Sequence, residues 1–247
     1  LKAFAKLNLR RQVKNPATRA ALTPDYAPGC KRLLLSNDWL PTLDRPDVDL
    51  VTSGLASVTE NSVVDASGRH RQVDTIIFAT GFTPTEPPVS HLLRGNDGRT
   101  LAQHWGGSPQ AHRGTTVAGF PNLFLMYGPN TNLGHSSIVY MLESQANYLV
   151  SALNAMKRRG IAAVEVVESA QRQHNSWVDA ELEGTVWNAG GCSSWYLDAN
   201  GRNSTMWPTY TFRFRSMTRE FDLANYRIVS DAPDSDTLDS DNEVVSA

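Results

Sequence analysis

The sequence has 247 residues, a length that allows one large domain or parts of two. About 40% of the residues are hydrophobic and 19% are charged, as in ordinary globular proteins. The formal net charge of -2 gives no overall field favouring nucleic acid or an anionic membrane. No segment approaches the roughly 20 apolar residues that a membrane span needs, and no signal peptide opens the chain.

The two cysteines, Cys30 and Cys192, lie far apart and form no C-x-x-C pair. This spacing argues against a disulfide framework, a zinc ribbon and a dithiol redox centre. We therefore expect a reducing, cytoplasmic compartment. The first residue is Leu1 rather than methionine, and we expect the natural N-terminus to lie upstream.

Residues 1–14 are expected to form an amphipathic helix that Pro16 ends. Its inward side would carry Ala3, Phe4 and Leu7. The opposite side is basic and carries Lys2, Lys6, Arg10, Arg11 and Lys14. Such a face suits either nucleic acid or lipid, or else the solvated side of a packed helix, and the last is the favoured interpretation.

The rest of the N-terminal half alternates short apolar runs with turns. The predicted strands are 32–35, 48–52, 55–60, 62–65, 73–79 and 122–127. The third and fourth form a hairpin, and Ser67-Gly68 supplies the next turn. The runs 73–79 and 122–127 are continuous and apolar, which predicts fully buried strands. Between them, residues 83–118 are expected to form a loop.

The best helix of the chain is expected from Ser136 to Arg159, with Ser136 as its N-cap and Gly160 closing it. Its predicted apolar stripe is Ile138, Leu142, Ala146, Leu149, Leu153 and Met156. A strand over 163–167 and a helix over 169–183 follow. Residues 185–215 read as irregular but ordered, and 230–247 as a disordered acidic tail.

Two strand ends carry the residues best suited to a ligand. One strand ends in Ala79-Thr80-Gly81, where glycine lets the backbone approach a flat group closely. An ordinary strand followed by a turn is the alternative. The second strand leads through a glycine loop to a helix N-terminus, which favours negative charge such as that of a reduced flavin. Its candidate residues are Gly128, Pro129, Asn130, Asn132, Gly134, His135 and Ser136.

The order and spacing of several motifs resemble the flavin-containing and Baeyer–Villiger monooxygenase families. The motifs are Pro24-Asp25-Tyr26, Gly29-Cys30-Lys31-Arg32, Ala79-Thr80-Gly81-Phe82, Gly119-Phe120-Pro121-Asn122-Leu123-Phe124, Gly128-Pro129-Asn130, Gly191-Cys192, Ser194-Trp195-Tyr196, Gly201-Arg202-Asn203 and Trp207-Pro208. The last four are typical of the branch that includes 4-hydroxyacetophenone monooxygenase. The resemblance covers most of residues 10–212.

This resemblance implies FAD and NADP as cofactors, and O2 and a small organic molecule as substrates. Arg32 matches the arginine that lies beside flavin and nicotinamide, where a permanent planar cation stabilises the anionic oxygenated flavin. Lys31 would lie near the NADP phosphate. The segment 79–81 would link the NADPH and FAD domains, and the loop 128–136 would line the flavin. Without the resemblance, Lys31-Arg32 would read as a surface basic pair.

The implied fold is α/β, part of a flavoprotein with two dinucleotide-binding domains. Residues 1–78 would end the NADPH domain with a helical insertion. Residues 79–160 would return to the doubly wound FAD domain, and 161–229 would be an extension packed on it. The G-x-G-x-x-G motifs and the F-x-G-x-x-x-H fingerprint of these families are missing, so the chain is expected to be a fragment.

Other chemistries have little support in the sequence. The six histidines show no metal-ligand spacing, so no metal site is expected, and only His135 suggests a flavin-side role. No G-x-S-x-G elbow or Walker lysine is present. The aromatic residues Trp195, Tyr196 and Trp207 either wall a substrate pocket or belong to the core.

Three functions stay open for the intact protein. The first is a monooxygenase that inserts oxygen into a ketone or a heteroatom. The second is a flavin-dependent NADPH oxidase or reductase without oxygen insertion. The third is a non-catalytic remnant. We expect neither nucleic acid nor a membrane span, and the oligomeric state is open.

Overall fold

The computed structural model describes residues 2–230, which divide into two compact units. Unit 1 comprises residues 2–83 and 184–194, and unit 2 comprises residues 84–183 and 195–230. Except for Ser230, the acidic segment expected over 230–247 lies outside the described residues. The domain boundaries expected from the sequence stay a prediction.

Four short helices belong to unit 1: α1 (Lys2–Gln12), α2 (Pro16–Ala21), α3 (Trp39–Leu43) and α7 (Val186–Ala189). The predicted inward face of the first helix is wrong, because Phe4 and Leu7 are exposed. Leu9 and Val13, one helical turn apart, are buried instead. Pro16 also starts the next helix, which Asn15 caps by accepting the amide of Ala17 at 2.9 Å.

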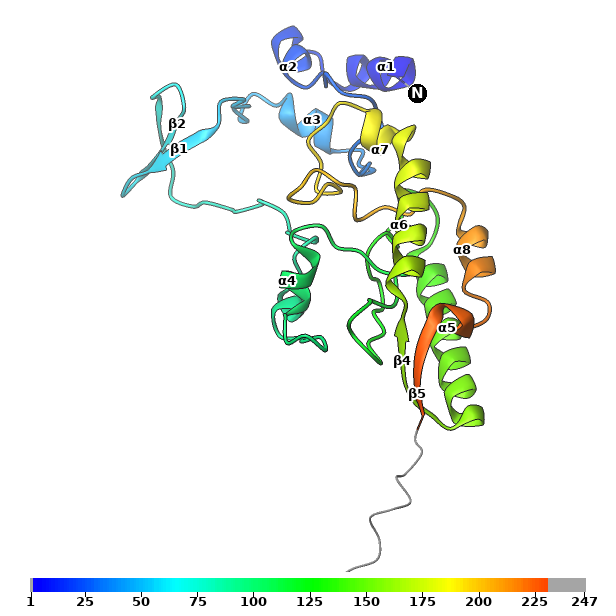
Figure 1. Ribbon diagram of the computed structural model, residues 1–247. Helices are drawn as coiled ribbons and strands as arrows, with labels where there is room; N and C mark the ends of the chain where they lie inside the picture. Colours follow the sequence, from blue (N-terminus) through cyan, green and yellow to red (C-terminus); the bar gives the residue numbers. More distant parts are fainter. Residues whose placement is uncertain (1, 231–247) are drawn as a thin grey trace, which may run out of the picture. The chain divides into compact units, whose positions relative to one another are not determined.

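A small antiparallel sheet in unit 1 confirms the predicted hairpin (Figure 1). It consists of β1 (Leu55–Val58), β2 (Ser62–Asp65) and β3 (His70–Gln72) in that order. Gly68, with a φ of 82°, makes the expected turn between the last two. Hydrogen bonds from Ser67 and Arg71 hold the pKa of the Asp65 carboxyl well below its usual range, against the effect of desolvation.

Three other predicted strands are absent from this unit. Residues 32–35, 48–52 and 73–79 have no regular secondary structure, so these predictions were wrong for this chain. Leu34 and Ile77 are 86% and 87% exposed. The physical reason is that an extended run gains little without a neighbouring strand to satisfy its backbone, and these runs have no such neighbour among the described residues.

The long helix α5 (Ile138–Arg159) lies beside the antiparallel pair β4 (Ile161–Val166) and β5 (Tyr226–Ser230) in unit 2 (Figure 1). Helices α6 (Glu168–Glu183) and α8 (Thr211–Met217) and the 3-10 turn η2 (Leu223–Asn225) complete this part. The core here contains Ala118, Ile161, Val164, Val166, Ala170 and Tyr226. The sequence predicted β4 and α6 but neither α8 nor β5.

Helix α5 confirms the predicted helix with two corrections. It begins at Ile138 with Ser137 as N-cap, so the assignment of Ser136 as cap was wrong; Ser136 has a φ of 54° and lies before the helix. Its buried face is rotated from the predicted stripe and carries Met141, Ser144, Gln145, Tyr148 and Ala152. Gly160 closes the helix in the left-handed conformation, as expected.

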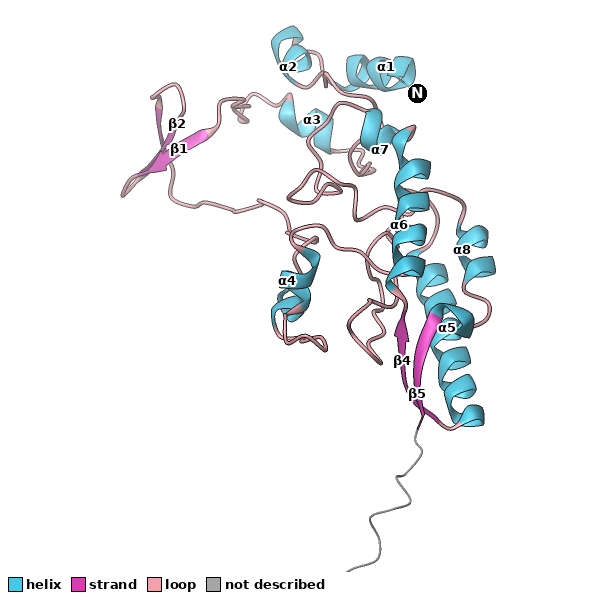
Figure 2. Cartoon of the chain, in the orientation of Figure 1, coloured by secondary structure: helices cyan, strands magenta, loops and turns pink. Residues whose placement is uncertain are grey.

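The first part of unit 2 is mostly loop, as predicted, with the 3-10 turn η1 (Pro88–His91) and helix α4 (Leu101–Trp105) inserted (Figure 2). Thr100 and Gln103 form a capping box at the start of α4. The predicted strand 122–127 is absent, because its amides donate to scattered partners and form no ladder: Asn122 to the carbonyl of Val164 in β4, Leu125 to the Thr115 carbonyl and Tyr127 to the Gln145 side chain. Within residues 2–230, no helix is both long and apolar enough to cross a membrane.

Candidate functional site

The extended segment before the glycine loop is fixed by a buried glutamine of α5. Gln145 accepts the amide of Tyr127 at 2.9 Å and donates to the carbonyl of Gly114 at 2.9 Å. It also donates to the hydroxyl of Thr115 at 3.1 Å. The Gln145 side chain therefore makes hydrogen bonds that a neighbouring strand would otherwise make with this segment. Gln145 was not identified from the sequence, because a glutamine in an amphipathic helix gives no distinctive signal.

Asn130 turns the chain and anchors the loop at the same time. It is 3% exposed and has a φ of 57°, a conformation that asparagine tolerates better than most residues. Its amide nitrogen donates to the carbonyls of Asn203 and Met206 at 2.8 and 3.1 Å. The amide nitrogen of Asn130 therefore forms its hydrogen bonds within the chain.

Asn132 makes the second half of this connection. Its side-chain oxygen accepts from the Tyr127 hydroxyl at 2.9 Å and from the Leu133 amide at 2.8 Å. Its backbone pairs with Thr205 and Trp207, at 3.0 and 2.8 Å. The motifs around Asn130 and Trp207, distant in sequence, thus form one structure.

Arg202 is the centre of that structure. Its guanidinium contacts the Asp179 carboxylate at 2.9 Å and the Asn130 side-chain oxygen at 3.1 Å. It also donates to the carbonyl of Pro109 at 2.9 Å and to Asn175 at 3.3 Å. Five donors in one plane suit this role, which a lysine cannot fill. The sequence placed Arg202 in a motif but gave it no role.

Two glycines let the backbone segments come together beneath this loop. A Cβ on Gly128 would lie 2.3 Å from the carbonyl oxygen of Gly114. A Cβ on Gly114, whose φ is 61°, would lie 2.2 Å from the Thr131 methyl group. Gly128 therefore has a packing role that does not depend on any ligand.

A pocket of about 260 Å³ opens beside the loop. Three of the predicted cofactor-binding residues, Gly128, Pro129 and Asn132, line it. Its other lining residues are Pro84, Thr85, Pro87, Val89, Trp105, Pro109, Leu125, Met126, Tyr127, Trp195, Ser204 and Thr205. The walls are mainly apolar and aromatic, with a few polar groups, as small-molecule sites usually are.

The sequence did not decide whether Trp195, Tyr196 and Trp207 line a pocket or belong to the core, and the structure shows one at the pocket and two in the core. Trp195 is 43% exposed and lines the pocket. Tyr196 and Trp207 are each 1% exposed and belong to the core. Trp207 packs edge-on against Phe214 of α8, at 5.0 Å between ring centroids.

The remaining loop candidates lie between Asn132 and α5. Gly134, His135 and Ser136 are exposed, and His135 Nδ1 lies 2.9 Å from the Ser136 hydroxyl. They do not line the pocket. Their cofactor-binding role stays a prediction.

The other candidates belong to unit 1. Arg32 and Lys31 are exposed on the turn after Cys30, and the Lys31 ammonium lies 4.8 Å from the ring centre of Tyr26. Ala79, Thr80 and Gly81 follow the exposed apolar run 76–78, and Gly81 has a φ of 87°. This positive φ favours glycine and does not by itself distinguish close approach to a flat group from an ordinary turn.

The expectation about the cysteines was wrong. Cys30 and Cys192 form a disulfide within unit 1, with their Cα atoms 6.1 Å apart. Sequence separation excluded nothing here, because the chain returns to unit 1 at residues 184–194.

A buried polar network ties the C-terminal segment to α5. Asp222 contacts His112 at 3.0 Å and Arg113 at 2.8 Å, and it accepts from the hydroxyl of Tyr148. Desolvation opposes ionisation of Asp222, yet these partners outweigh it and lower its pKa to about 2. Desolvation raises the pKa of Tyr148, which therefore stays a hydrogen-bond donor. We assign this network to stability.

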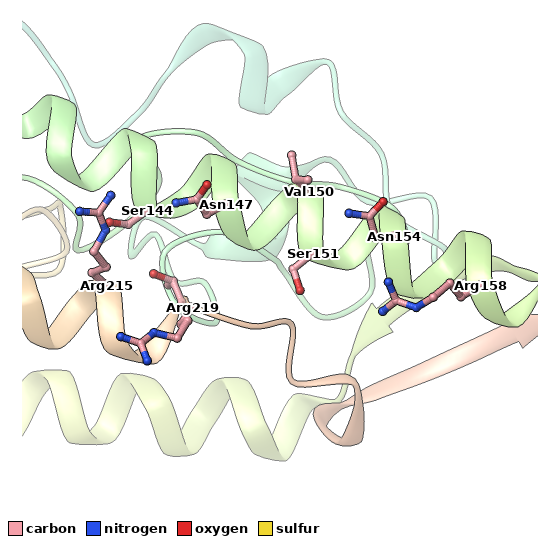
Figure 3. A pocket seen from close by; sticks show the side chains of 9 residues that line it. Ser144, Asn147, Val150, Ser151, Asn154, Arg158, Arg215 and Arg219 are labelled. Carbon is pink, nitrogen blue, oxygen red and sulfur yellow. The ribbon is translucent and has the colours of Figure 1, made fainter.

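A larger and more polar pocket of about 540 Å³ lies between α5 and the segment around α8 (Figure 3). Arg158, Arg215 and Arg219 surround it, and Arg215 is 3.5 Å from Glu143. None of the predicted site residues lines this pocket. Among residues 2–230, no three His, Cys, Asp or Glu side chains form a metal-binding group.

The chain is similar in sequence to proteins named Baeyer–Villiger monooxygenases. It is 46% identical over 224 residues to a Baeyer–Villiger monooxygenase of Pseudomonas aeruginosa, covering 90% of this chain and 42% of that protein. It is 48% identical over 231 residues to a Baeyer–Villiger monooxygenase of Streptomyces coelicolor, covering 93% and 44%. No family model matches.

Solved structures agree with these sequence matches. A steroid monooxygenase bound to NADP has a TM-score of 0.78 and 27% identity, over 93% of this chain and 45% of that one. A closed cyclohexanone monooxygenase has a TM-score of 0.81 at 23% identity, which shows the fold alone. The chain thus spans less than half the length of the relatives that it matches, and its fold is a part of their mixed α/β fold.

Proposed function

The chain is a relative of the Baeyer–Villiger monooxygenases, and we propose that it is the C-terminal part of an FAD- and NADPH-dependent enzyme of this kind. The intact protein inserts one atom of O2 into a ketone. The observation that carries the proposal is the identity of 46–48% over about nine tenths of the chain. The motif order and the pocket beside the glycine loop are consistent with it.

The residues of unit 2 fit one part of a bound flavin. The pocket offers apolar and aromatic walls for a flat ring. The 247 residues contain no G-x-G-x-x-G loop to hold a pyrophosphate. We therefore infer that this chain supplies a wall of the ring site, while an upstream part supplies both phosphate sites.

Each candidate residue has a physical task in this proposal. Gly128, Pro129 and Asn132 shape the pocket wall, and the Asn130–Arg202 connection keeps that wall in place. The segment Ala79-Thr80-Gly81 crosses close to the cofactors. Gly134, His135 and Ser136, just before α5, present polar groups and the positive end of the helix dipole.

Arg32 is the proposed catalytic residue and Lys31 the proposed partner of the NADP phosphate. The bound flavin, once reduced by NADPH, supplies the oxygen chemistry. Arg32 keeps a planar positive charge near the reacting atoms at any pH of interest. That charge stabilises developing negative charge and orients the nicotinamide amide through hydrogen bonds.

Exposed apolar runs support the need for an upstream part. Leu33–Leu35 and Ile76–Phe78 have the composition of buried strands but lie exposed. The relatives contain more than half of their length outside the matched region. We propose that these runs pair with strands of that missing part. Independence of nucleic acid stays a prediction. The cytoplasmic location also stays untested, and the disulfide removes the cysteine argument that was given for it.

The test is oxygen insertion by the full-length natural protein. It is supplied with NADPH, ¹⁸O2 and a panel of ketones, and products are analysed by mass spectrometry. We expect an ester or lactone with one labelled oxygen atom. Replacement of Arg32 by alanine should leave slow flavin reduction and abolish the product. NADPH oxidation without any oxygenated product from ketones, sulfides or amines would support the reductase alternative instead.

A further inference from the structure

The disulfide of unit 1 joins two segments whose sequence positions differ by 162 residues. Cys30 is fully buried and Cys192 is half-buried. A Cα separation of 6.1 Å is within the ordinary range for disulfides. The described residues contain no free cysteine. Both cysteines of the chain, Cys30 and Cys192, are therefore in this one disulfide.

Cys30 lies two residues before Arg32, and the residues around the disulfide pack closely. The amide of Ala27 donates to the carbonyl of Gly190 at 2.9 Å, and the amide of Cys30 donates to Ala27 at 3.1 Å. A Cβ on Gly190 would lie 2.7 Å from the Cys30 sulfur. Segment 184–194 therefore packs against the turn 27–30, and position 190 has no room for a residue larger than glycine.

We propose that the Cys30–Cys192 bond is a positioning strut, which holds the turn carrying Lys31 and Arg32 and releases it on reduction. The proposal rests on the role of Arg32 proposed above. Cys30 and Cys192 are positioning residues, because neither need touch a cofactor. A charged side chain must be held to within a fraction of an ångström to stabilise a transition state, so a loosened turn lowers the rate.

The redox step balances with an ordinary dithiol as reductant. A thiolate of the dithiol attacks the sulfur of Cys192, which is the more exposed of the two. The bond between the two sulfurs breaks, and Cys30 leaves as a thiolate that takes up a proton. The second thiol of the reductant then displaces Cys192, which also takes up a proton. Glutathione disulfide, or another small disulfide, reverses the step and is itself reduced to two thiols.

The first experiment tests the bond itself on the full-length protein. The protein is purified without reductant, alkylated under denaturing conditions and digested. We expect one peptide pair joined through Cys30 and Cys192, which dithiothreitol separates. Free, alkylated thiols at both positions after treatment with oxidised glutathione would overturn the proposal.

The second experiment tests positioning. Amide exchange at Ala27 and Cys30, and product formed per NADPH consumed, are measured with and without dithiothreitol. We expect reduction to speed exchange at both amides and to lower the product yield about tenfold, while the KM for the ketone is unchanged. Cys192→Ser should reproduce the reduced state and no longer respond to dithiothreitol. Ser193→Ala, a neighbouring exposed residue, is the matched control and should respond like the natural protein.

The outcomes separate the two proposals. A normal product yield in the reduced protein and in Cys192→Ser would overturn the strut and leave the monooxygenase proposal intact. Absence of any oxygenated product in the natural protein, with the peptide pair and the exchange change both present, would refute the proposed function. In that case the strut would still stand as a structural element without the role assigned to it.

Discussion

The glycine loop of unit 2 and the run 73–82 of unit 1 both lack regular secondary structure, yet they are held in opposite ways. In the loop, Asn130 is 3% exposed and every polar atom of its side chain has a partner within the chain. In the run, Ile77 and Phe82 are 87% and 95% exposed. The sequence pattern of the run is the more regular of the two, but its side chains are the more exposed.

The difference shows what each kind of segment requires. The loop is held by individual hydrogen bonds, and their partners, such as Gln145 and Arg202, belong to this chain. An apolar extended run is ordered by strands on both sides, which must come from elsewhere. The chain therefore stabilises the loop by itself, whereas we propose that the run depends on residues outside this chain.

The largest effect is expected for the centre of the loop structure. Arg202→Ala leaves two buried amide oxygens, of Asn130 and Asn175, without their donor, and should lower the free energy of unfolding by about 3–5 kcal/mol. Arg213, which is exposed and 3.4 Å from Glu181, is the matched control. Arg213→Ala should cost about 0–1 kcal/mol. Urea unfolding measures both, and equal losses would show that the loop does not depend on Arg202.

For the apolar run 73–82, the expected effect of a substitution differs between this chain and the full-length protein. Ile77→Ala should leave the unfolding free energy of this chain unchanged, because the side chain is already exposed. In the full-length protein the same change should cost about 2–5 kcal/mol, since a strand side chain would be lost from a core. Leu182→Ala, at a position 1% exposed, should be costly in both. A neutral Ile77→Ala in the full-length protein would contradict the pairing.

Close backbone approach beneath the loop can be tested with two glycines. Gly98 and Gly114 both have positive φ, but only Gly114 would place a Cβ against another residue. Gly98→Ala should cost about 1–2 kcal/mol from conformation alone. Gly114→Ala should cost about 1–3 kcal/mol more, because the Thr131 side chain must move. Thermal unfolding compares the two, and similar losses would remove the packing argument.

A pH dependence is expected of unit 2, spread over several pH units. Desolvation, with the charges of nearby groups including His112 and Arg113, lowers the pKa of His174 from 6.5 to about 3. Between these values the unfolded chain binds a proton that the folded chain does not. Stability is thus complete above pH 6.5 and falls toward pH 3, by up to about 1.4 kcal/mol per pH unit.

Asp222 adds its own loss at lower pH, between 3.8 and about 2, because its folded pKa is depressed. Urea unfolding between pH 7 and 4 separates the histidines from Asp222, since burial also lowers the pKa of His104. His174→Gln should flatten the dependence in that range. An unchanged slope in His174→Gln would assign it to another group.

Local patterns predicted much of the fold. The hairpin around Ser62, the helix ending at Gly160 and the helix ending at Glu183 depend on neighbours in the sequence, and each is confirmed. The strand predictions at 32–35 and 73–79 failed because a hydrophobic pattern does not by itself form a strand, and these runs have no strand partner among the described residues.

The candidate site was predictable in its motifs but not in its connections. The sequence identified Gly128, Asn130 and Asn132, whereas the roles of Gln145 and Arg202 follow only from contacts across long separations. The disulfide was missed for the same reason. The cofactor roles of the predicted residues stay predictions that flavin-bound material would test.

The most direct test of the account is flavin retention by this chain with and without its upstream part. Residues 1–247 are expressed alone, and together with the natural upstream segment as a separate polypeptide, and the absorbance of bound flavin is measured after purification. We predict a colourless protein in the first case and a yellow complex holding one FAD in the second. One FAD bound to the chain alone would contradict the division of the cofactor site proposed here.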